Sequence, residues 1–174
     1  MDRDRKLPFF LRCQADEMTC TTRLAHEPFR PDVELADLID GAIAVGAIVS
    51  FVGVSRPASH DGHTMESLLL DHCPGMTERS LSEIAADASD RFDIEHIRVV
   101  HRCGFIEPGE PIVFVAAAAV HRRAAFEAAD YLMDRLKTDA VFWKREGRDS
   151  GSVWMEPSEQ DRQDRARWSD RCQE

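Results

Sequence analysis

The sequence has little cysteine, and its cysteines form no recognisable framework. Five occur among 174 residues, an odd number, and no two of them stand in a C-x-x-C pair. Disulfide-rich secreted domains carry cysteines in even numbers, and structural zinc sites show paired spacings. We therefore expect neither a disulfide framework nor a metal site, and we predict a reducing, cytoplasmic location.

Long apolar runs are also missing. No stretch approaches the roughly 20 residues that a membrane-spanning helix needs. The apolar run Pro8–Leu11 is too short for the core of a secretory signal. A positive net charge is missing too, because 32 acidic residues outnumber 22 basic ones and give a formal net charge of -10. An acidic surface argues against binding to nucleic acid or to an anionic membrane, but it leaves room for a local basic pocket.

Aromatic residues make up 7% of the chain, but hydrophobic residues make up 43%, which is enough for the core of one domain. The spacing of apolar residues and the positions of Gly and Pro predict the elements. We expect helices over 32–40, 76–92 and 122–138, and strands over 44–54, 65–72, 97–103, 112–120, 141–144 and 152–156. The strand 44–54 is expected to be largely buried. Because no Gly-rich phosphate loop is present, the pattern favours an α+β fold over a doubly wound sheet.

The sequence divides into three parts. Residues 1–25 show no clear period and are predicted to form a loosely ordered arm. Residues 26–157 hold all the expected helices and strands. Residues 158–174 are strongly charged and show no apolar face, so a mobile tail is expected.

Cations and apolar residues are concentrated after the last long helix. Lys137 and Lys144 stand seven residues apart, around Phe142 and Trp143. A lysine beside another cation can become a base or a nucleophile. For Lys137 alone, compensation of the helix dipole is the simpler explanation. The two lysines form an active site only if the following strand folds back along the helix.

Other cations stand where strands end. His121 and Arg122 lie at a strand-to-helix junction, which is either a phosphate site or a solvated helix start. Arg56 follows a strand and lies either in a cleft or in water. One stripe of the long helix has cations at both ends: Arg122, Phe126, Ala129, Met133 and Lys137. The sequence predicts that these cations and the two lysines share one hollow.

Other catalytic patterns are missing from the sequence. It contains no Ser-His-Asp order, carboxylate pair or metal-ligand spacing. Cys73 and Cys103 have no neighbouring motif that would mark a nucleophile. We therefore predict no cofactor.

Five segments occur in a specific order and spacing, namely Gly46–Arg56, Pro74–Met76, His101–Gly104, His121–Phe126 and Lys137–Glu146. Through them, residues 27–157 resemble the large catalytic subunit of molybdopterin synthase. The resemblance implies an α/β hammerhead fold with an additional small antiparallel β subdomain. It also implies a homodimer of large subunits.

The resemblance further implies a sulfurtransferase of molybdenum cofactor biosynthesis. A small ubiquitin-like sulfur-carrier subunit docks at each end of the homodimer and completes a heterotetramer. The carrier's C-terminal Gly-Gly thiocarboxylate enters the pocket of the large subunit. Two sulfurs pass to cyclic pyranopterin monophosphate, which becomes molybdopterin.

Residue roles carry over by position. The resemblance implies that Lys137 and Lys144 are catalytic. Its substrate-contact and pocket-wall positions match Val54, Ser55, Arg56, His121, Arg122, Arg145, Glu146, Phe51 and Met133. As a hypothesis, Lys137 is the general acid/base and a candidate covalent partner, while Lys144 holds the tail carboxylate or the substrate. The order in which the lysines act stays open. Ser158 stands close to where some members have an arginine, and residues 1–25 have no counterpart.

Two other functions are compatible with these residues. The first is a non-catalytic module that binds a ubiquitin-like sulfur carrier, which the intact lysine pair and Arg56 argue against. The second is a phosphate-ester hydrolase that uses the same basic pocket. It needs a metal or a cysteine or serine nucleophile, and the sequence offers no good site for either.

Overall fold

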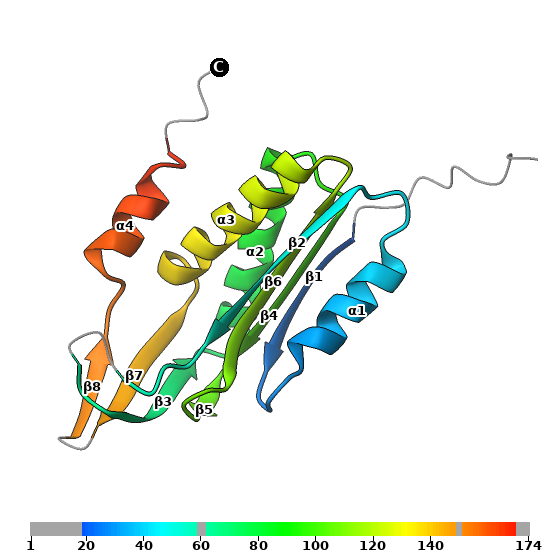
Figure 1. Ribbon diagram of the computed structural model, residues 1–174. Coiled ribbons are helices and arrows are strands. Elements are labelled where there is room, and N and C mark those ends of the chain that lie inside the picture. Colours follow the sequence, from blue (N-terminus) through cyan, green and yellow to red (C-terminus); the bar gives the residue numbers. More distant parts are fainter. Residues whose placement is uncertain (1–18, 59–61, 149–150, 170–174) are drawn as a thin grey trace, which may run out of the picture.

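The computed structural model describes residues 19–58, 62–148 and 151–169, which form two β-sheets and four helices (Figure 1). In chain order the elements are β1 (Thr19–Ala25), α1 (Pro31–Gly41), β2 (Ala47–Val54), β3 (Met65–His72), α2 (Met76–Arg91), β4 (His96–Arg102), β5 (Gly104–Ile106), β6 (Pro111–Ala119), α3 (Arg122–Thr138), β7 (Phe142–Arg148), β8 (Gly151–Met155) and α4 (Glu159–Ala166). Most of the elements predicted by periodicity are present, with ends shifted by a few residues.

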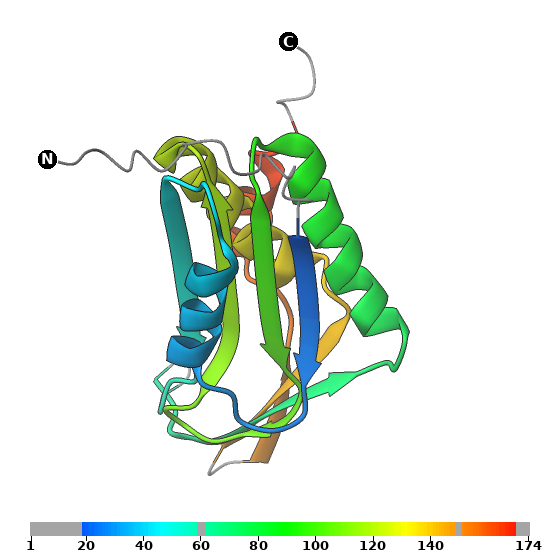
Figure 2. The same cartoon turned by 90° about the vertical axis from the view of Figure 1, so that its right-hand side faces the viewer.

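The first sheet has the strand order β1-β4-β6-β2. β1 runs parallel to β4, and the other neighbours are antiparallel. Helices α2 and α3 cover one face of this sheet and α1 covers the other (Figures 1 and 2). Because side chains alternate along a strand, the middle strand β6 serves both cores. Val115 and Ala117 face α2 and α3, while Phe114 and Ala116 face α1.

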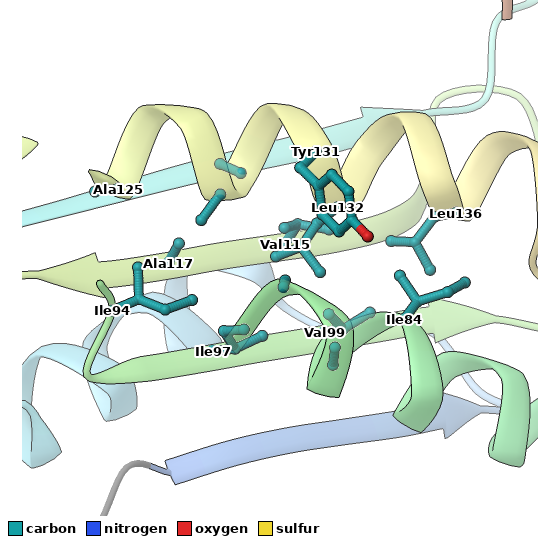
Figure 3. Close-up of a cluster of buried hydrophobic side chains, with 14 of the residues drawn as sticks. Ile84, Ile94, Ile97, Val99, Val115, Ala117, Ala125, Tyr131, Leu132 and Leu136 are labelled. Carbon is teal, nitrogen blue, oxygen red and sulfur yellow. The ribbon is translucent and has the colours of Figure 1, made fainter. Parts of the chain in front are cut away.

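The main core lies between the first sheet and the helices α2 and α3 (Figure 3). Leu132 and Ala125 of α3 are fully buried there, against Val115 and Ala117 of β6. The alanines of β6 are small, so they allow the helix to lie close to the sheet. This packing fixes the position of α3, which carries Arg122, Met133 and Lys137 of the predicted site.

The second sheet has the order β5-β3-β7-β8 and is antiparallel throughout. It lies beyond one end of the first sheet (Figures 1 and 2). Its own small core consists of Met65, Leu68, Leu70 and Ile106. Two sheets with mixed helices and strands confirm the predicted α+β class with an additional antiparallel subdomain.

The predicted N-terminal arm is too long, because Thr19–Ala25 forms the strand β1. This strand pairs along its whole length with β4. Only Ala25 of β1 is buried, so its threonines and arginine show no apolar alternation that would reveal a strand. Residues 1–18 lie outside the described part of the chain.

The predicted mobile tail is also wrong for its first part, because residues 159–166 form α4 beside α3. Trp168 follows α4 and is only 2% exposed. Its ring packs edge-to-face against Phe92 and Tyr131. The segment buries a single aromatic side chain and has no apolar helical face. Helical periodicity of apolar residues therefore gives no sign of it. Residues 170–174 lie outside the described part.

The strand β2 is less buried than its sequence predicts. It lies at the edge of the first sheet, and Phe51 and Val52 are 43% and 38% exposed. Apolar and β-branched residues indicate a strand, but they do not distinguish a core strand from an edge that another chain can cover.

Candidate active site

The two lysines lie at the C-terminal end of α3 and in the strand that follows it. Lys137 is in the last turn of α3, and Lys144 is in β7, which follows after a short connection. Both charges act on the carboxylate of Asp161 in the first turn of α4. One acidic group is therefore within electrostatic reach of both amines, which places the amines on the same side of the molecule.

A buried glutamate holds the ammonium group of Lys144. Side chains alternate along β7, so Lys144, Glu146 and Arg148 share one face. The Glu146 carboxylate is 4% exposed and lies 3.3 Å from Lys144 Nζ. Its other oxygen accepts a hydrogen bond of 3.0 Å from the Arg148 guanidinium. The sequence predicted Glu146 as a contact residue but missed Arg148, because its role depends on the register of the strand.

A neutral histidine lies within electrostatic reach of Lys137. The pKa of His101 is lowered to about 4, mainly by burial. The hydrogen bond to the Arg102 carbonyl raises this pKa, and the charge of Lys137 lowers it further. That bond is 2.8 Å long and needs the proton on Nδ1, because a carbonyl can only accept. The ring also stacks on Phe142 at 4.2 Å between centroids. His101 is therefore an uncharged aromatic ring within electrostatic reach of Lys137.

Helix α4 supplies a second carboxylate, that of Asp161, to this region. Burial alone would raise the pKa of Asp161, but hydrogen bonds from the Ser158 hydroxyl and amide, with the charges of Lys137 and Lys144, leave it below its usual value. Ser158 in turn accepts a bond from the Asp161 amide and caps the helix. Thus Ser158 is a helix cap, and it positions the carboxylate that lies near the lysines.

The end of β2 lies at the same end of the molecule as Lys137. Both β2 and α3 run antiparallel to β6, so their C-terminal ends lie together (Figure 1). Val54 and Arg56 are exposed there, while Ser55 is 2% exposed. The backbone of Ser55 exchanges hydrogen bonds of 2.8 and 2.9 Å with the turn at Gly109 and Glu110. Ser55 therefore anchors the loop that carries Arg56.

His121 and Arg122 lie at the opposite end of α3. They line a surface cavity of about 760 Å³ at the start of this helix. The 15 residues from Arg122 to Lys137 rise by about 22 Å along a helix. Within a single chain a straight helix therefore separates these cations from the lysines. The prediction that they share one hollow stays a prediction and requires a second copy of the chain.

Phe51 and Met133 do come together. They line a second cavity, of about 420 Å³, between β2 and the middle of α3. Phe126 and Glu127 line both cavities, so the two adjoin. Met133 lies one turn before Lys137 on the same face of the helix. The predicted stripe of α3 thus lines an open groove that leads from His121 toward Lys137, in which apolar residues such as Phe126 and Met133 stand beside charged ones such as Glu127. We call it the α3 groove.

Arg145 does not share a face with Lys144. The alternation of β7 turns it to the other side of the small sheet, where its guanidinium lies 5.3 Å from the centre of the Trp154 ring. Trp143 and Trp154 are 50% and 57% exposed on that side. Arg145 and Glu146 were predicted as one contact segment, but the strand separates them.

None of the helices in the described residues is long and apolar enough to cross a membrane.

Comparisons with known proteins give one consistent family. The family model described as MoaE protein matches residues 24–139. The molybdopterin synthase catalytic subunit of Caulobacter vibrioides is 45% identical over 145 residues, which cover 83% of this chain and 95% of that protein. The corresponding subunit of Escherichia coli is 45% identical over 124 residues, 71% of this chain and 81% of that protein.

Solved structures agree with the sequence comparisons. The molybdopterin biosynthesis MoaE protein of Burkholderia ambifaria superimposes with a TM-score of 0.74 at 36% identity, over 87% of this chain and 99% of that chain. Molybdopterin synthase from Staphylococcus aureus gives a TM-score of 0.69 at 26% identity, over 76% of this chain and 94% of that chain.

Proposed function

Because the chain belongs to the MoaE family, the family of molybdopterin synthase catalytic subunits, we propose that it transfers two sulfurs to cyclic pyranopterin monophosphate and so forms molybdopterin. The sulfur donor in this proposal is the C-terminal thiocarboxylate of a small ubiquitin-like carrier subunit. The reaction takes place in the cytoplasm, where thiols such as those of Cys20, Cys73 and Cys103 stay reduced.

The observation that carries the proposal is the arrangement of the two lysines. Lys144 is held by the buried carboxylate of Glu146, and Lys137 lies within electrostatic reach of the neutral His101. Such an arrangement stabilises the negative charge of a thiocarboxylate and of the intermediates that follow from it. In the proposal Lys137 exchanges protons with the reacting groups and Lys144 orients the carrier's tail.

The pterin's cyclic phosphate calls for a separate anion site. Arg122 and the amides at the start of α3 have the chemistry for it. Since about 22 Å of helix separates them from Lys137 in one chain, we propose that a second copy of the chain supplies this contact. The α3 groove supports a homodimer, because Phe126 is 61% exposed there and Phe51 and Val52 are exposed on the neighbouring edge strand.

The test is a defined reaction with purified components. The full chain is incubated with thiocarboxylated carrier and pterin precursor, and mass spectrometry records the gain of two sulfurs. Lys137→Ala should reduce turnover by roughly 10²–10⁴-fold, as expected for loss of a general acid/base. Arg79→Ala is the matched control, because Arg79 forms an exposed ion pair with Glu83 on α2.

Carrier binding separates this function from a non-catalytic module. Isothermal titration of the carrier onto Lys137→Ala should show affinity close to that of the unchanged chain. If the unchanged chain binds the carrier and yields no dithiolene, the protein is a binding module and the proposal is wrong. Near-normal turnover of Lys137→Ala would also contradict it.

A further inference from the structure

Three side chains with metal-binding atoms lie together outside the lysine region. The ligand atoms of His26, His72 and Cys103 are all within 4.8 Å of one another. Cys103 Sγ lies 3.2 Å from His26 Nδ1, although the two residues are 77 positions apart in the sequence. The rings of His26 and His72 meet edge-to-face with centroids 5.3 Å apart.

These side chains come from three separate parts of the fold. His26 follows β1 directly, His72 is the last residue of β3, and Cys103 stands between β4 and β5. The Cys103 amide donates a hydrogen bond of 3.0 Å to the Ala25 carbonyl, which ties two of these segments together. The strands on both sides of the cluster therefore fix where its ligands lie.

We propose that His26, His72 and Cys103 form a binding site for a divalent transition metal, with Zn²⁺ as the ion that fits the ligands best. One thiolate and two imidazoles are ligands that zinc prefers. With zinc bond lengths, tetrahedral ligand atoms lie about 3.3–3.6 Å apart. The distance between Cys103 Sγ and His26 Nδ1 is already close to this value. The other two separations are at most 4.8 Å, so a bound ion needs only a small inward movement of the side chains.

The surroundings of the cluster suit a cation that enters from solvent. Cys103 is fully buried, His72 is partly buried and His26 is exposed, so the site has a closed side and an open side. The Glu78 carboxylate lies within electrostatic reach of all three ligands. It also accepts a hydrogen bond of 2.7 Å from the Gly75 amide, which holds it in place.

Glu78 thus offsets the positive charge of the ion, and water from the open side completes the coordination. Binding releases the thiol proton of Cys103 to solvent.

A metal at this position connects the two sheets. His26 and Cys103 extend from strands of the first sheet, and His72 ends the strand β3 of the second. In the ladder between β3 and β7, His72 lies opposite Phe142, which stacks on His101. The bound ion therefore stabilises the junction from which β7 presents Lys144. Because the ion binds the folded chain, an excess of about 100 times Kd should raise the melting temperature by roughly 5–10 °C.

The test uses the reduced full chain after removal of metal. Zn²⁺ affinity is measured by competition with a chromophoric chelator, and Co²⁺ serves as a spectroscopic probe. We expect one tight equivalent and a sulfur-to-cobalt charge-transfer band with the visible bands of a tetrahedral ion. Cys103→Val should abolish the charge-transfer band. His26→Ala should weaken zinc binding at least about 10-fold, which is the loss expected even for a residue that only supports a ligand.

Matched controls separate this site from the other cysteines and histidines of the chain. Cys20→Ser removes an exposed thiol and His63→Gln an exposed imidazole, and both variants should keep the affinity and the spectrum. The proposal is overturned if the unchanged chain binds no zinc, if Cys103→Val keeps the charge-transfer band, or if His26→Ala keeps full affinity. Because His26 is exposed, its variant tests the site even where Cys103→Val does not fold. None of these measurements depends on sulfur transfer.

Discussion

Among single residues, Glu146 has the clearest role in the lysine region. Its carboxylate is 4% exposed and touches one exposed cation and one buried cation, Lys144 and Arg148. A buried charge is tolerated only when it is paired and hydrogen-bonded. Glu146 therefore fixes the position of Lys144 and neutralises Arg148.

We expect Glu146→Gln to lower both stability and turnover. The amide keeps the shape of the side chain but leaves the Arg148 charge uncompensated. The free energy of unfolding should fall by roughly 2–4 kcal/mol, and Lys144 should lose its orientation. Urea denaturation and the sulfur-gain assay measure the two effects. Glu83→Gln, on an exposed ion pair of α2, should change stability by no more than about 0.5 kcal/mol. Equal stability of the two variants would contradict this account.

His101 should make the fold sensitive to mild acid. Its pKa is about 4 in the folded chain and near 6.5 when unfolded, so the unfolded chain binds more protons between these values. The contribution of His101 is fully present above pH 6.5 and is lost as the pH falls toward 4. Between pH 8 and pH 5 this amounts to about 2 kcal/mol of unfolding free energy. Urea denaturation of the unchanged chain and of His101→Asn at both pH values checks it. A variant with the same pH dependence would refute the assignment.

Sequence reasoning found individual residues better than it found their partners. Lys137 and Lys144 could be predicted because they stand close together beside aromatic residues and match a family pattern. Arg148 and Asp161 could not, because their places near Lys144 depend on strand register and on the packing of α4. The same holds for the histidines and the cysteine of the proposed metal site. They come together only because the ends of three strands that are distant in the sequence meet in the fold.

At the scale of elements, α4 shows how a charged segment can dock through one buried aromatic residue together with ion pairs, such as Arg165 with Asp139. Trp168 packs against Phe92 and Tyr131, and its indole nitrogen donates a hydrogen bond of 2.6 Å to Asp134. The Trp168 side chain is 2% exposed, whereas no residue of α4 itself is buried. Trp168 therefore holds α4 on α3, and with it the carboxylate of Asp161.

Trp168→Ala should detach α4 and lower the free energy of unfolding by roughly 3–5 kcal/mol, the usual cost of emptying a buried tryptophan site. The melting temperature of the full chain measures the effect. Trp154→Ala is the matched control, since Trp154 is 57% exposed, and it should change stability by about 0.5 kcal/mol at most. A similar small change for both variants would show that α4 contributes little to the fold.

The elements that the sequence predicted best are those with a long, regular apolar period. α3 and β3 were found with the ends that they have in the structure. β1 was missed because its side chains are mostly exposed, and its stability comes from backbone pairing with the buried strand β4. Pairing with a distant strand leaves no trace in the local period of side chains.

At the scale of the whole molecule, the basic groups form two separate poles joined by the α3 groove. Lys137 and Lys144 lie at one end of α3, and His121 and Arg122 lie at the other. The exposed apolar residues between them include Phe51 and Phe126. A symmetric dimer that covers this groove buries those residues. It can also bring the His121 and Arg122 pole of one copy to the lysines of the other.

Complementation between inactive variants tests whether a site spans two copies. If a site does span two copies, a heterodimer of one Lys137→Ala copy and one Arg122→Ala copy has two unequal sites. One site contains both substitutions, and the other contains neither. Coexpression should then restore turnover to roughly a quarter of the original, since about half of freely mixed dimers are heterodimers. Lys137→Ala with Lys144→Ala is the matched control, because both lysines belong to one pole and every mixed site keeps a defect. Each variant must be impaired when expressed alone, and sedimentation must confirm that dimers form. If the first pair then shows no recovery of turnover, a site that combines Lys137 of one copy with Arg122 of the other is excluded.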